Sequence, residues 1–265
     1  MRNGKKELQI GLVLTGIILG LAILSIFYLP YDYNAMDKAA RSLAPSFRHL
    51  FGTDSYGRDI FSRAIFGSRY TLLVALSTVG SCTVIASVLG LVSGYVGGMP
   101  DEIIMRIIDA ISSFPDILIA LMVVTVLNLG QFTIVVALCI TFVPSFTRIV
   151  RTATLQYKNA EFVKNLRVFG VSDLRILLVH IFPNTFPLLL STIVIGLSNA
   201  ILAEAAMSYL GLGIQPPIPS WGRMLQEAQT IVYTAPWAAV CPGIMIVVTI
   251  VGLNCIGEGL RKLYL

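Results

Sequence analysis

The 265-residue chain has few charged side chains. Asp, Glu, Lys and Arg together make up 12% of the sequence, whereas hydrophobic residues make up 56% and the mean hydropathy is +0.82. Soluble domains carry roughly 25% charged residues, which cover their water-facing surface. This shortage excludes an ordinary soluble fold and indicates that the lipid bilayer is the solvent of the chain.

The sequence also lacks the groups that most catalytic and metal sites need. Its two histidines, His49 and His180, lie in different polar segments, and neither a G-x-S-x-G nor an H-E-x-x-H motif is present. The four cysteines form no C-x-x-C pair, which favours small buried hydrophobic residues over a disulfide or a metal site. We expect no catalytic residue and no metal ligand in this chain.

Nucleotide and nucleic-acid binding have no support either. There is no G-x-x-x-x-G-K-[ST] loop, so the chain cannot hold ATP in the usual phosphate cradle. The formal net charge is +5, but the basic residues lie in the gaps between apolar runs. There they are typical of topology signals and contacts with lipid headgroups rather than of nucleic-acid binding.

Six apolar runs are long enough to cross about 30 Å of hydrocarbon as helices, which predicts an all-α polytopic membrane protein. The first run is roughly 20 residues long, whereas a signal-peptide core is about 7–15, so we expect an uncleaved span. Kinks are predicted at Pro115 and Pro144, and a tight turn at 128–131. The predicted spans are 10–29, 70–96, 103–127, 131–149, 186–209 and 237–257.

Six spans place both termini on the same side of the membrane. More Lys and Arg residues lie with the termini and the segment 150–185 than on the opposite side. The positive-inside rule therefore predicts that both termini and this segment are cytoplasmic. On the other side, Asp54, Arg58, Asp59 and Arg63 alternate in sign at helical spacings, and we expect them to pair with one another before the second span.

An amphipathic helix is predicted within the segment 150–185. Phe162, Leu166 and Phe169 recur at i, i+4 and i+7, which places them on one helix face, and Gly170 is a natural helix stop. Two interpretations stay open from the pattern alone. The helix lies on the lipid headgroups, or it docks into the groove of a soluble partner.

Several segments resemble a known family. Glu161, Gly170 and Ile181-Phe182-Pro183-Asn184 resemble the EAA loop of binding-protein-dependent ABC importer permeases. Two further segments resemble the dipeptide, oligopeptide and nickel branch of that family, in its C-type second permease: Phe51-Gly-Thr-Asp-Ser-Tyr-Gly-Arg-Asp-Ile-Phe-Ser-Arg63, and Met207-Ser-Tyr-Leu-Gly-Leu-Gly213 followed by Pro219-Ser-Trp-Gly-Arg-Met224.

The resemblance implies a type I ABC permease fold and a particular set of partners. An N-terminal helix with an extracytoplasmic segment, 1–69, would precede a five-span core, 70–265, with the cytoplasmic coupling loop 150–185. The chain would sit as a multi-pass protein in the inner or plasma membrane beside a second, homologous permease. Two cytoplasmic ATPase subunits would hold ATP and Mg²⁺, an extracytoplasmic binding protein would deliver the substrate, and this chain would bind no cofactor.

The resemblance and the charge pattern together select candidate site residues. Acidic residues within spans are costly, by about 2.5–3.5 kcal/mol at a span centre, so Glu204 and Asp116 are expected to line the translocation path or its gate. Hydrogen bonding between helices is the alternative role for Glu204. The outer loop 210–236 is expected to dock the binding protein through Trp221, Arg223 and Gln226. The coupling residues expected to contact the ATPase are Glu161, Phe162, Leu166, Phe169, Gly170 and Pro183.

Peptides are the preferred substrate, and nickel or a metal–chelator complex is the alternative because that branch shares the same motifs. A stand-alone secondary transporter is a further class. It would need a relay of intramembrane charges or two related halves, and the sequence shows no internal repeat.

Overall fold

The computed structural model describes residues 2–127 and 132–264, and within these ranges its regular structure is helical apart from an isolated bridge between Thr53 and Asp59. The prediction of an all-α protein is confirmed. The α-helices are α1 (Arg2–Phe27), α2 (Ile60–Val96), α3 (Gly98–Ser112), α4 (Asp116–Val126), α5 (Thr133–Lys158), α6 (Glu161–Val168), α7 (Asp173–Arg175), α8 (Phe182–Tyr209), α9 (Trp221–Ala228) and α10 (Trp237–Tyr264). Shorter turns are η1 (Lys38–Ala40), the π-helical η3 (Ile176–Ile181) and η4 (Gln229–Ile231).

Among the described residues, five helices are long and apolar enough to cross a membrane, and a sixth span forms if α3 and α4 are counted together. These two helices are bent by 91° across a short break. Pro115 lies in the break because proline has no amide hydrogen and disfavours a helical conformation at the preceding residue, here Phe114. The bend predicted at Pro115 is confirmed, and it is a full interruption. The predicted turn at 128–131 lies outside the described residues.

Three helices extend beyond the predicted spans. Helix α2 begins at Ile60 rather than at 70, α5 continues to Lys158, and the helix ending at Tyr209 starts at Asp173 rather than at 186. Helix α2 has 37 residues, a length of about 55 Å, which exceeds the hydrocarbon thickness of about 30 Å. The ends of α2 therefore extend beyond the hydrocarbon layer and can be polar. A search for apolar runs does not detect these end turns. The proposed division at 69/70 falls inside this helix.

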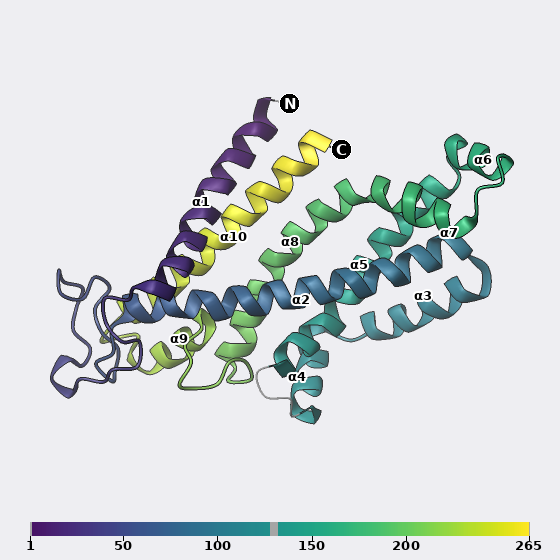
Figure 1. Cartoon of the computed structure of the whole chain (residues 1–265). Coiled ribbons are helices and arrows are strands. Elements are labelled where there is room, and N and C mark those ends of the chain that lie inside the picture. The colour runs from purple at the N-terminus through teal and green to yellow at the C-terminus, as the bar shows by residue number, and fades with distance from the viewer. Residues whose placement is uncertain (1, 128–131, 265) are drawn as a thin grey trace.

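Helices α1 and α10 run side by side, with the two termini at the same end of the molecule (Figure 1). Glycines make this close approach possible. A Cβ atom on Gly11 would lie 2.6 Å from the carbonyl oxygen of Gly252, and one on Gly259 would lie 2.8 Å from the amide nitrogen of Leu8. At the end of the pair, the ammonium of Lys262 bonds both carboxylate oxygens of Glu7 at 2.7 Å.

Helix α2 passes through the centre of the bundle and packs on α5 and α8 (Figure 1). A Cβ atom on Gly90 would lie 2.7 Å from Cβ of Val150, so α2 and α5 approach closely. Cys82, Cys139 and Cys241 are buried free thiols. They behave as the small apolar residues that the sequence indicates.

The loop 28–59 before α2 and helix α9 lie together at one end of the molecule (Figure 1). Asp54 accepts a bond of 2.7 Å from Nε of Arg58, and its other ion pair, with Arg63, is longer at 3.8 Å. The predicted pairing within this cluster is thus confirmed for Asp54. Asp59 instead caps α2 and lies 2.9 Å from Nδ1 of His49.

Candidate functional site

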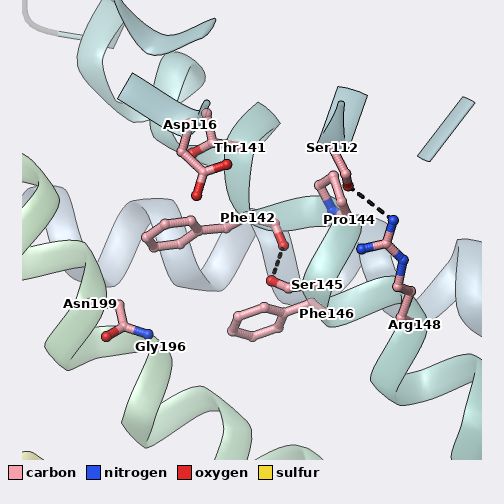
Figure 2. A pocket seen from close by; sticks show the side chains of 10 residues that line it. All are labelled: Ser112, Asp116, Thr141, Phe142, Pro144, Ser145, Phe146, Arg148, Gly196 and Asn199. Carbon is pink, nitrogen blue, oxygen red and sulfur yellow. Dashed lines mark hydrogen bonds between the residues drawn. The ribbon is translucent and has the colours of Figure 1, made fainter. Parts of the chain in front are cut away.

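A polar cavity of about 310 Å³ lies where the break between α3 and α4 meets α5 and α8. Figure 2 shows its side chains projecting from these separate elements. Gly196 lets α8 approach the Phe146 ring in this wall, because a Cβ atom there would lie 2.5 Å from Cζ of Phe146 and the ring would have to shift. The wall consists of Ser112, Asp116, Thr141, Phe142, Pro144, Ser145, Phe146, Arg148, Gly196 and Asn199.

A second, more apolar cavity of about 430 Å³ adjoins the first. The two cavities share Asp116, Thr141, Phe142 and Asn199, so together they form one groove with a polar half and an apolar half. Both halves of the groove are open to the surroundings of the isolated chain. Its remaining apolar wall consists of Ile117, Ala120, Leu138, Leu202, Ala203, Ala206 and Met207.

The two charged residues of the polar half differ in their partners. Nη2 of Arg148 donates bonds of 2.7 Å to Asp109 and 3.0 Å to the hydroxyl of Ser112. Asp116 begins α4 and is exposed in the isolated chain. Its carboxylate forms no hydrogen bond or ion pair with any residue that the structure describes.

The sequence pattern predicted Asp116 as a site residue but missed Asn199. A single amide within an apolar span is a comparable signal, because both groups are polar within a span.

Glu204 does not lie in this groove. It is completely buried in α8, where Ser208 donates a hydrogen bond of 2.6 Å to its Oε1. Ser208 also accepts a bond of 3.2 Å from the amide of Ile214, which holds the chain that leaves α8. In this chain the side chain of Glu204 therefore faces the packed interior and not the groove, and its role in the translocation path or gate stays a prediction.

Helix α9 is packed more tightly than its position between two spans suggests. Trp221 is completely buried, and its Nε1 donates a bond of 2.9 Å to the carbonyl of Ala64 in α2. Its side chain cannot contact a binding protein in this arrangement, so that assignment is corrected. Arg223 and Gln226 are half-buried and hydrogen-bonded to each other.

Helix α6 projects at the end of the molecule opposite α9 (Figure 1). Val163 is completely buried and anchors it to a cluster that includes Ile176 and Ile181. Leu166 packs against the same cluster, whereas Phe162 is 38% and Phe169 83% exposed. The predicted single stripe is thus divided, with Leu166 turned inward and the two aromatic rings outward.

Gly170 ends α6 as predicted, with φ of +74°. The amide of Val171 donates to the carbonyl of Leu166 at 3.1 Å, and that of Gly170 donates to the carbonyl of Arg167 at 3.0 Å. These two bonds form a Schellman motif, in which glycine is favoured because it has no Cβ atom. Glu161 is exposed in the first turn of α6, and Pro183 is exposed in the first turn of α8.

Apolar spans, a groove at a broken helix and a projecting amphipathic helix define a polytopic membrane protein of the transporter class. Residues 86–264 match the family described as the binding-protein-dependent transport system inner membrane component. The chain belongs to this family of ABC importer permeases, whose members are non-catalytic membrane components located in the inner membrane.

Three curated relatives cover most of the chain. The dipeptide transport permease DppC of Alkalihalophilus pseudofirmus is 35% identical over 95% of this chain and 83% of its own length. The glutathione transport permease GsiD of Escherichia coli O157:H7 is 40% identical over 92% and 81%. The oligopeptide transport permease OppC of Bacillus subtilis is 36% identical over 98% and 85%.

The fold also resembles that of a solved structure. A chain of the MetNI methionine ABC transporter in an inward-facing conformation superposes with a TM-score of 0.62, covering 76% of this chain and 95% of that chain. The two sequences are 16% identical, so this likeness concerns the fold alone. It supports the predicted ABC importer permease architecture.

Proposed function

We propose that this permease carries short peptides into the cell. The observation that supports the proposal most directly is that dipeptide, oligopeptide and glutathione permeases match this chain along more than nine-tenths of its length. Peptides are preferred to the nickel alternative because these three relatives are named for peptide and glutathione transport. The groove between α4, α5 and α8 is the candidate path.

On its open side the groove has no wall from the described part of this chain. Asp116 and Asn199 are exposed there, and polar groups within spans are costly where they face lipid. We infer that a second permease covers this side, so that the path runs between the two chains. The N-terminus, the C-terminus and α6 would lie in the cytoplasm, where the Lys and Arg bias places them.

Energy would enter through α6. Phe162 and Phe169 present their rings outward from a helix that is anchored by Val163, which is the arrangement of an amphipathic helix bound in a groove. We infer that an ATPase subunit, which would hold ATP and Mg²⁺, supplies this groove. At the opposite end, the loop 210–236 would meet the binding protein through exposed residues such as Tyr233, which is 99% exposed, and through Arg223 and Gln226.

Uptake by the reconstituted complex tests this proposal. The chain is placed in proteoliposomes with its second permease, its ATPase subunits and its binding protein, and accumulation of radiolabelled alanyl-phenylalanine is measured. We expect accumulation that requires both ATP and the binding protein, and no competition by nickel ions. Accumulation of nickel without accumulation of peptide would contradict the assignment.

A further inference from the structure

The groove holds an acidic side chain that lacks a partner. Asp116 lies at the 91° break within a span, and both halves of the groove include it in their walls. Figure 2 shows its carboxylate projecting toward the space that Phe142 and Asn199 border from the other side. No residue that the structure describes forms an ion pair or hydrogen bond with this carboxylate, and the same holds for the Asn199 amide.

The other charges of the groove do not balance Asp116. The guanidinium of Arg148 is already paired with Asp109 at 2.7 Å and bonded to Ser112, so its charge is matched. The remaining polar lining groups, Ser112, Thr141, Ser145 and Asn199, are neutral. The boundary between the two halves therefore carries an uncompensated negative charge. An unpaired carboxylate at membrane depth is costly, so this position is suited to a cation that comes from outside the chain.

We propose that Asp116 receives the α-ammonium group of the peptide in transit. This inference rests on the proposed function, because the α-ammonium is the cation that every linear peptide with a free N-terminus carries. Asn199, on the opposite wall, offers an amide that can bond the first peptide group. The adjoining apolar half of about 430 Å³, lined by residues such as Leu138 and Met207, takes an apolar side chain of the same peptide.

Photolabelling tests this contact in the permease complex. The binding protein is left out, so that its own selectivity does not affect the result. The reconstituted complex, without binding protein, is irradiated with radiolabelled alanyl-4-benzoylphenylalanine, which carries a free α-ammonium, or with its N-acetyl derivative. Labelled fragments of this chain are then mapped. We expect labelling within α5 and α8 by the free peptide, suppressed by excess alanyl-phenylalanine, and roughly tenfold less labelling by the acetylated one, as for loss of one charge-assisted hydrogen bond.

Substitutions assign the preference to Asp116. Asp116→Asn should reduce labelling by the free peptide roughly tenfold and leave the acetylated peptide unchanged, whereas Asp116→Glu should keep most of the preference. Glu258→Gln, the same loss of charge at the end of α10, should leave the labelling unchanged. Among the residues that the structure describes, Glu258 forms an ion pair only with Arg261 on its own helix, so it is a matched control outside the groove.

The outcomes separate the two proposals. If parent proteoliposomes accumulate peptide but label equally with both probes, or if Asp116→Asn keeps the preference, the ammonium contact is wrong and peptide transport stands. This result is also expected if Asp116 pairs with a cationic side chain of the second permease. If the parent proteoliposomes accumulate no peptide, the proposed function itself fails.

Discussion

The guanidinium of Arg58, in the outer loop, donates a hydrogen bond of 2.5 Å to the carboxylate of Glu227 in α9, 169 residues further along the chain. The same carboxylate oxygen accepts a bond of 2.9 Å from Arg63 at the start of α2. The side chains of Arg58 and Arg63 are only 6% and 2% exposed. Glu227 therefore joins α9 to α2 by compensating two buried positive charges.

Glu227→Gln is expected to destabilise the outer end of the protein. Among the described residues, the substitution leaves Arg58 and Arg63 with Asp54 as their one remaining acidic partner, and breaking a buried ion pair costs roughly 3 kcal/mol. Thermal unfolding of the detergent-purified protein should show a clear loss of stability. Glu102→Gln is the control, because its pair with Arg106 is 61% and 78% exposed and such pairs contribute about 0–1 kcal/mol. Equal melting temperatures for the two variants would refute a stabilising role for Glu227.

Gly252→Leu is expected to separate α1 from α10. A Cβ atom at Gly252 would lie 2.7 Å from Oγ1 of Thr15 and 3.1 Å from Cβ of Leu14, and overpacking of this kind costs about 1–3 kcal/mol. The measurement is crosslinking of Glu7→Cys to Lys262→Cys by a short bifunctional thiol reagent, in a background without the native cysteines. We expect efficient crosslinking in the parent and much less in Gly252→Leu.

Gly243→Leu supplies the matched control for this test. Gly243 lies in the same helix, but a Cβ atom there would meet no other atom within 4 Å. The crosslink between positions 7 and 262 should therefore form as in the parent. If Gly252→Leu crosslinks equally well, the two helices do not depend on the glycine contact.

Local chemistry made some features of this fold predictable. Pro115 lies at the break of its span, because proline removes a ladder hydrogen bond and disfavours a helical residue before it. Pro144 causes no such break, since it lies inside the continuous helix α5. Gly170 ends α6 because glycine takes a positive φ without strain. The burial of Trp221 and the pairing of Glu227 could not be predicted, since both depend on contacts with α2, which is distant in sequence. The helical period also placed Leu166 with Phe162, but Leu166 packs on the cluster that buries Val163 whereas Phe162 is 38% exposed.

The orientation of the chain is testable with an impermeant thiol reagent. Phe47 in the outer loop and Lys164 in α6 are both exposed, so Phe47→Cys and Lys164→Cys offer one reporter at each end of the molecule. In intact cells we expect labelling at position 47 and none at position 164 until the membrane is permeabilised. Labelling of position 164 from outside would show that the Lys and Arg bias has been misread.

Phe169 is the strongest candidate for the ATPase contact, because its ring is 83% exposed on a helix whose inner side is fixed by Val163. Truncating an exposed ring removes little stability from the chain itself. An aromatic anchor buried by a partner, however, contributes about 2 kcal/mol or more to binding. We therefore expect Phe169→Ala to insert and fold normally, to bind the ATPase subunits more than tenfold more weakly, and to lose most uptake.

Gly170 tests the same contact through the backbone. Its φ is +74° and a Cβ atom there would meet no other atom within 4 Å, so a side chain would be disfavoured by conformation alone, by about 1–2 kcal/mol. Gly170→Val should displace the end of α6 and reduce uptake, whereas Gly170→Asn should retain most uptake because asparagine tolerates the left-handed region. Glu161→Gln should have a smaller effect, through the helix dipole alone. Full uptake by a Phe169→Ala, Gly170→Val double variant at normal expression would exclude α6 as the coupling element.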